Sequence, residues 1–189
     1  LEMYTFDPNA DDITRDNLIR QSVELIAKFP TIIAYAYNIL RHSQQGRSLH
    51  IRHPLEGASI AENFLYMIKG PNNYTELDVK LLDLCLILHA EHGGGNNSTF
   101  SVRVTSSTQT DTYSAIAAGI GSLKGPLHGG ANIEVKDMFD HLKEAIKNWK
   151  DVKEIDAYIN KMLNKDAYNR TGLIYGIGHA VYTISDPRA

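Results

Sequence analysis

Three histidines that lie beside glycines are the residues of this 189-residue chain best suited to chemistry. His92 precedes three glycines, His128 lies in a Gly-Pro-Leu-His-Gly-Gly segment, and His179 follows Gly-Ile-Gly. Glycine lets a ligand or another backbone come close to the neighbouring side chain. A lone histidine is usually a surface or satisfied core residue, but three in the same setting favour a binding or catalytic site. They do not by themselves name a reaction.

His128 is the most informative of the three. It follows a helix-breaking Gly-Pro pair and precedes a helix that we expect to begin near Gly130, so its ring would lie at the positive end of a helix dipole. That field disfavours the imidazolium and leaves a neutral ring that donates one hydrogen bond. Such a donor suits a carbonyl that becomes an enolate. The alternative is a histidine that merely caps local carbonyl groups.

His179 and Arg188 form a second candidate pair, nine residues apart. The planar fork of arginine matches a carboxylate, and the histidine would polarise a neighbouring carbonyl of the same acidic substrate. On spacing alone, a surface arginine that ends a turn is the better interpretation.

A metal site is the weakest of the chemical hypotheses. His89 and His92 lie three residues apart on one helical face, with Glu91 as a base or third ligand. The chain has no His-Glu-x-x-His pattern and a single cysteine, so we expect no metal.

Composition narrows the class of protein. The formal net charge is −3 and the pI about 6.2, without a basic run, which disfavours a nucleic-acid partner. Cys85 lies in an apolar stretch, which predicts a small buried side chain rather than a reactive thiol. No apolar stretch approaches the roughly 18 residues of a membrane span and no signal-peptide pattern is present, so we expect a cytoplasmic protein.

The elements that would position these residues are helices, and the predicted class is all-α. Apolar residues recur at three- and four-residue intervals over 16–43, where Pro30 predicts two helices or one sharp kink. Further helices are expected over 54–70, over 75–92 behind a Thr75–Asp78 cap, over 101–105, 111–123 and 131–150, and from Asp151 to Leu163. The glycine-containing segment after Asp166 is predicted to be a loop.

The histidine blocks, in this order, resemble the citrate synthase family. The most specific pair is Gly-Pro-Leu-His-Gly around His128 and Gly-His-Ala-Val…Asp-Pro-Arg from His179 to Arg188, and the segments at 25–31 and 61–65 resemble the helices ahead of the active site. The resemblance implies a helical homodimer, built from a large and a small domain, that condenses oxaloacetate with acetyl-CoA. It implies no permanently bound cofactor, with acetyl-CoA as co-substrate.

The resemblance also implies a role for each matching residue. His128 matches the donor to the acetyl thioester carbonyl, and His179 matches the residue that polarises the ketone of oxaloacetate. The substrate's oxygens and carboxylate would be held by His92 and Arg188, with polar support from Asn96 and from Ser98, which would orient His128. The CoA-contacting segment would be formed by Ile174, Tyr175, Gly176 and Gly178, and the dimer helix by the small residues over 115–121.

The family's domain boundary gives residues 1–128 as part of the large domain and 129–189 as the start of a truncated small domain, with Gly129 and Gly130 as a candidate hinge. Two departures from the family are evident. The family's general-base aspartate and further arginines come after the Asp-Pro-Arg block, so we expect this chain alone to be nearly inactive. Thr183 stands where some members carry a basic residue near the CoA phosphates.

Two alternatives stay open at this stage. One is a 2-methylcitrate synthase that uses propionyl-CoA, since the residues lining the acyl pocket cannot be identified from the sequence. The other is a non-catalytic helical dimerisation module that presents its small-residue helix to a partner.

Overall fold

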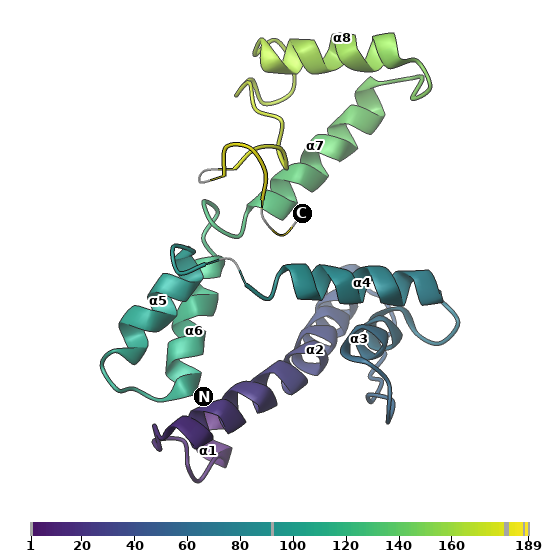
Figure 1. The fold of residues 1–189 in the computed structure, drawn as a ribbon. Helices are drawn as coiled ribbons and strands as arrows, with labels where there is room; N and C mark the ends of the chain where they lie inside the picture. The colour runs from purple at the N-terminus through teal and green to yellow at the C-terminus, as the bar shows by residue number, and fades with distance from the viewer. Residues whose placement is uncertain (1, 92, 180–181, 187, 189) are drawn as a thin grey trace. The chain divides into compact units, whose positions relative to one another are not determined.

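The computed structural model describes residues 2–91, 93–179, 182–186 and 188, and in these residues the fold is all-α, as predicted, with no strand. Eight helices follow one another along the described chain (Figure 1): α1 (Glu2–Phe6), α2 (Arg15–Gln45), α3 (Ile60–Lys69), α4 (Glu76–Leu88), α5 (Asn97–Ser106), α6 (Thr112–Leu123), α7 (Ala131–Ala145) and α8 (Val152–Leu163).

The chain divides into two compact units, Leu1–Ala118 and Gly119–Ala189, and the division falls within α6. The unit that holds residues 1–118 is called the N-terminal unit below, and the other the C-terminal unit. The domain boundary that the family resemblance implies, between His128 and Gly129, divides the chain at a different place and stays a prediction.

α2 is one continuous helix with Pro30 inside it. Of the two expected outcomes, two helices or one sharp kink, the division into two helices is therefore wrong. An interior proline removes one backbone hydrogen bond and costs roughly 3 kcal/mol. Packing on both sides of the proline offsets that cost. Leu25 lies in a core cluster on the N-terminal side, while on the C-terminal side Ala34 is fully buried and Asn38 donates to the carbonyl of Met67 in α3 (3.2 Å).

α2 is also long and apolar enough to cross a membrane by length and composition. This is weak evidence for a membrane segment, because the core helix of a globular protein passes the same test. α2 also contains two ion pairs between residues four positions apart, Glu24 with Arg20 and Glu24 with Lys28.

α4 begins with the predicted capping box, in which the Thr75 hydroxyl accepts from the Asp78 amide and the Asp78 carboxylate accepts from the Thr75 amide. It ends at Leu88 rather than at His92, with His89 as its C-cap. α4 packs on α3, but none of its residues is buried. The prediction that Cys85 is buried is therefore wrong, because the face of α4 that carries it is exposed.

The C-terminal unit is built on α7 and α8. Its core consists of Met138 and Leu142 on α7, Ile146 just after it, and Met162 on α8. The loop after α8 packs its apolar side chains on this core through Ala167, Tyr168, Ile174 and Tyr175. α7 ends at Ala145, earlier than the expected residue 150, whereas α8 begins after the predicted Asp151 cap, whose carboxylate accepts from the Lys153 amide (3.0 Å).

Candidate active site

His128 lies in a tight turn directly before α7, as the sequence predicts. Its backbone amide donates to the carbonyl of Gly125 (3.0 Å), and α7 begins after the N-cap residue Gly130. The side chain is half-buried. A helix N-terminus exposes unsatisfied amides and carries partial positive charge, and His128 lies two residues before the N-cap of α7.

Two glycines give this turn its shape. A Cβ on Gly129 would collide with the carbonyl oxygen of Leu123, and a Cβ on Gly130 with that of Pro126. Only glycine permits such close passage of one backbone segment over another. The Gly-Gly pair after His128 is therefore required locally, whether or not it also acts as the expected hinge.

The predicted CoA-contacting segment lies against the same helix. Gly176 has φ +85°, and a Cβ there would come within 3.0 Å of Val135 Cγ2 on α7. Val135 is four residues after Ala131, which places it about 6 Å along the helix axis from the first residue of α7. His128 and the 174–178 segment are thus both associated with the first part of α7.

The segment turns two of its predicted ligand-binding residues inward and the others outward. Ile174 and Tyr175 are half-buried against the core of the C-terminal unit, whereas Gly176 and Gly178 are exposed and Ile177 is 79% exposed. Both glycines have φ near +85° to +88°, which residues with a side chain rarely adopt. A ligand would meet the backbone of 176–178 rather than the side chains of Ile174 and Tyr175.

His179 and Arg188 each contact a side chain two or three residues away in the chain. The ring of His179 stacks on Tyr182, with centroids 4.6 Å apart, and its Nδ1 accepts from the Tyr182 amide (3.1 Å). This bond fixes Nδ1 as an acceptor, which leaves Nε2 as the N–H of a neutral ring.

The guanidinium of Arg188 is held by Asp186 in a two-point ion pair. Nη2 donates to Oδ2 (2.6 Å) and Nε donates to Oδ1 (2.9 Å), and the same Oδ1 accepts from the Arg188 amide (2.9 Å). An aspartate that accepts from the amide two residues later forms a common turn, so Arg188 ends a turn, as the spacing alone favours.

The remaining predicted residues belong to the N-terminal unit. Asn96 is the N-cap of α5, where its side-chain oxygen accepts from the amides of Ser98 (2.9 Å) and Thr99 (3.2 Å). Ser98 is half-buried in the first turn of α5. His92 lies outside the described residues, so its expected role in holding oxaloacetate, like the orientation of His128 by Ser98, stays a prediction.

The structure gives the metal hypothesis no further support. His89 Nδ1 donates to the carbonyl of Cys85 (2.6 Å), which occupies one of its two ring nitrogens. Among residues 2–91, 93–179, 182–186 and 188, no three histidine, cysteine, aspartate or glutamate side chains gather as a metal site would require.

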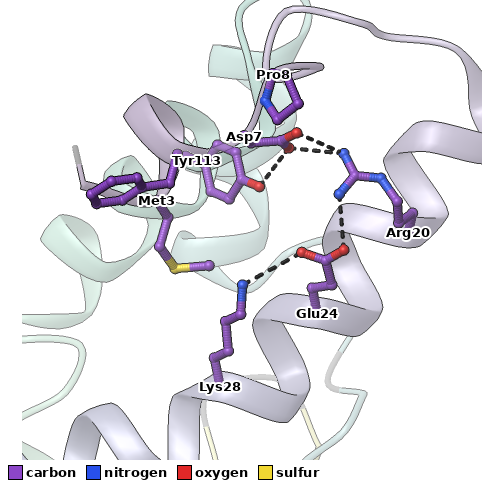
Figure 2. A pocket seen from close by; sticks show the side chains of 8 residues that line it. Met3, Asp7, Pro8, Arg20, Glu24, Lys28 and Tyr113 are labelled. Atoms are coloured by element: carbon purple, nitrogen blue, oxygen red, sulfur yellow. Dashed lines mark hydrogen bonds and ion pairs between the residues drawn. The ribbon is translucent and has the colours of Figure 1, made fainter.

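The N-terminal unit contains a pocket of about 260 Å³ that is lined by charged and apolar side chains, shown in Figure 2. Asp7 is at its centre: its carboxylate accepts from Arg20 Nη2 (2.8 Å) and from the Tyr113 hydroxyl (2.7 Å). The other guanidinium nitrogen, Nη1, pairs with Glu24 (2.8 Å), which also meets Lys28 (3.5 Å). Two acidic and two basic side chains line the pocket, so its formal charges balance and give no net attraction for an ion.

The pKa values of this cluster follow from its hydrogen bonds. Burial raises the pKa of Asp7, but the bonds from Tyr113, Arg20, the Asn9 amide and Gln21 outweigh it and hold the pKa well below its usual range. Burial and the bond to Asp7 raise the pKa of Tyr113 to about 12. The cluster is thus a carboxylate with several donors, which is a structural ion pair rather than an acid or base ready to exchange a proton.

Comparison with known proteins identifies the family. All of residues 1–189 match the family model described as "Citrate synthase, C-terminal domain". A citrate synthase from Deinococcus radiodurans is 42% identical over 184 residues, covering 97% of this chain and 43% of the relative. A 2-methylcitrate synthase from Shewanella oneidensis is 37% identical over 164 residues, covering 87% of this chain and 39% of the relative.

The fold agrees with these matches. The crystal structure of citrate synthase from Thermotoga maritima MSB8 superimposes with a TM-score of 0.65 at 34% identity, covering 94% of this chain and 43% of that structure. The chain spans less than half the length of the relatives that it matches. With the family model matched over residues 1–189, the chain belongs to the citrate synthase family.

Proposed function

We propose that the full-length protein containing this chain condenses oxaloacetate with an acyl-CoA, with acetyl-CoA as the preferred substrate and citrate as the product. The observation that carries the proposal is the association of His128 and the 174–178 segment with the first part of α7. A thioester bound through its CoA at exposed 176–178 would have its carbonyl group near a half-buried histidine at a helix N-terminus.

In this mechanism His128 donates a hydrogen bond to the thioester oxygen while the methyl group loses a proton to a general base, an aspartate that the family resemblance places after the Asp-Pro-Arg block. The enolate carbon then attacks the ketone carbon of oxaloacetate, which His179 polarises through its Nε2–H. Arg188, held in place by Asp186, would bind a carboxylate of the keto acid. Hydrolysis of the resulting thioester releases citrate and CoA.

The chain spans less than half the length of the relatives that it matches. The functional assay therefore requires the full-length protein with oxaloacetate and acetyl-CoA. CoA release is followed with a thiol reagent, and a full-length protein that turns over no acyl-CoA contradicts the proposal.

Replacing His128 by alanine tests its assigned role. Loss of one donor to a developing oxyanion lowers kcat by about 10²- to 10³-fold, or roughly 3 to 4 kcal/mol. His50→Ala, in an exposed loop of the N-terminal unit, is the matched control and should leave kcat unchanged. A His128→Ala protein with an unaltered kcat would show that another group stabilises the enolate.

Propionyl-CoA is the second candidate substrate, because one relative is named a 2-methylcitrate synthase. The ratio of kcat/KM for the two acyl-CoA substrates decides between them. One additional methylene in a fitted pocket changes that ratio about 10- to 200-fold.

We further propose a homodimer in which α6 takes part, as the family resemblance implies. Ala115 is buried within the N-terminal unit, whereas Ile120 on the same helix is 49% exposed. Sedimentation equilibrium of the full-length protein tests the assembly. Dimerisation without any response to oxaloacetate or acyl-CoA would favour the non-catalytic dimerisation module instead.

A further inference from the structure

The loop after α8 is closed on itself by one asparagine side chain. Asn169 Nδ2 donates to the Tyr175 hydroxyl (2.8 Å), while its Oδ1 accepts from the Thr171 hydroxyl (2.8 Å) and the Thr171 amide (3.2 Å). The Thr171 hydroxyl oxygen in turn accepts from the Leu173 amide (3.3 Å). We call Asn169, Thr171 and Tyr175 the loop bracket.

Aromatic rings attach the bracket to both helices of the C-terminal unit. Tyr175 meets Tyr168 edge to face, with centroids 6.4 Å apart, and Tyr168 lies 4.9 Å from the ring of His141 on α7. His141 Nε2 is 2.6 Å from the hydroxyl of Tyr158 on α8. Edge-to-face pairs of this kind contribute orientation as well as apolar contact, so Tyr175 is fixed at both its ring and its hydroxyl.

The residue after Tyr175 begins the exposed part of the loop. Gly176 and Gly178 have positive φ, so their backbone is more permissive than that of any other residue type. Without an anchor, such a segment would populate many conformations, and a ligand would lose affinity by ordering it. The fixed position of Tyr175 and the close approach of Val135, which leaves no room for a Cβ at Gly176, remove much of that freedom.

We infer that Asn169 and Tyr175 are positioning residues for acyl-CoA, since they hold the backbone of 176–178 in the conformation that contacts the CoA moiety. Neither side chain needs to touch the ligand, because Tyr175 is turned toward the core. The inference rests on the proposed function in taking CoA as the ligand of this segment.

The test compares Asn169→Ala, Tyr175→Phe and the double variant in the full-length protein. Each single change removes the Asn169–Tyr175 bond, and one hydrogen bond corresponds to about a 2- to 12-fold effect. We expect KM for acyl-CoA to rise by that factor while KM for oxaloacetate and kcat stay the same. The double variant should be no worse than Asn169→Ala, because both changes break the same bond.

Asn160→Ala, an exposed asparagine within α8, is the matched control and should leave both KM values unchanged. An unchanged KM for acyl-CoA in both single variants overturns the inference. Equal increases in the KM values of both substrates also overturn it, because they indicate general damage rather than positioning of one segment.

Calorimetric titration with coenzyme A alone separates this inference from the proposed function. If the full-length protein binds CoA but condenses nothing, the proposed function fails, and a weaker Kd in Asn169→Ala still supports the positioning role. If the unmodified protein does not bind CoA, or binds it equally well in Asn169→Ala, the positioning role is overturned.

Discussion

The Asp7 cluster in the N-terminal unit and the loop bracket in the C-terminal unit are both side-chain networks, but they connect the chain over very different distances. Tyr113 donates to Asp7 across 106 positions of sequence, whereas Asn169 and Tyr175 are six residues apart. A bond between distant segments resists unfolding of the whole unit, while a bond within a short loop only selects among conformations of that loop.

The two networks also differ in charge. Asp7, Arg20 and Glu24 are ionised, and the side chain of Asp7 is only 6% exposed. The bracket is built from neutral groups, and the neighbouring Tyr168 stays a neutral phenol because burial, followed by negative charge on Glu134 and Asp137, raises its pKa. The Asp7 cluster should therefore determine the stability of the fold and its pH dependence, and the loop bracket should determine ligand affinity.

Gln21→Ala is expected to have the largest effect on stability. The Gln21 side chain is fully buried, and its amide donates to Asp7 Oδ2 (3.0 Å) and to the carbonyls of Asn9 (3.2 Å) and Ala10 (3.3 Å), while its oxygen accepts from Thr112. Removing it leaves buried acceptors unpaired, which costs about 2 to 3 kcal/mol of unfolding free energy. Urea denaturation of the full-length protein measures the loss.

Gln44→Ala is the control for this prediction, since Gln44 is exposed in the last turn of α2. Its free energy of unfolding should stay within about 0.5 kcal/mol of the unmodified protein. Equal losses in the two variants would show that the Asp7 cluster adds nothing specific.

Tyr113→Phe is expected to cost less, about 1 to 2 kcal/mol, because it removes only the hydroxyl that donates to Asp7. The ring stays in the cluster with Ala10 and Leu25. The variant should also change the alkaline limb of the stability curve. A neutral phenol with a pKa of about 12 stabilises the fold fully below pH 10, and this contribution is lost as the pH rises from about 10 to 12. Phenylalanine has no such dependence.

Asp7→Asn tests the acid limb. The pKa of Asp7 is lowered in the fold, so the unfolded chain binds its proton more readily and the stabilisation is present above the ordinary aspartate pKa of about 3.9. It is lost as the pH falls below that value toward the folded pKa. The difference in unfolding free energy between the unmodified protein and Asp7→Asn should be largest near pH 6 and shrink below pH 4. A difference independent of pH would mean that Asp7 is not ionised in the fold.

The helices were predictable because their signals are local. The apolar period and the caps at Thr75 and Asp151 act within one or two turns, and both caps are present. Two of the wrong predictions came from tertiary structure. Continuation of α2 through Pro30 depends on what packs around it, and the exposure of Cys85 depends on which faces of α4 are covered. Neither the continuity of α2 nor the exposure of Cys85 can be predicted from the neighbouring residues in the sequence.

The candidate site divides in the same way. The position of His128 before α7 follows from a Gly-Pro break and a helical period, both readable from the chain. The side chains that contact His179 and Tyr175 cannot be read from the sequence in this way. The stacking of Tyr182 on His179 and the bond from Asn169 to Tyr175 arise from the path of irregular backbone, which residue type alone does not specify.

Asn169→Ala is expected to have the smallest effect on stability, below about 0.5 kcal/mol, although it weakens binding of acyl-CoA. Asn169 is exposed, and its three hydrogen bonds all lie within six residues, so water replaces them without separating any helix from the core. Urea denaturation of both variants compares the loss of unfolding free energy in Asn169→Ala with that in Gln21→Ala. An Asn169→Ala loss as large as that of Gln21→Ala would mean that the bracket holds the C-terminal unit together, and the division between a network for stability and a network for binding would then fail.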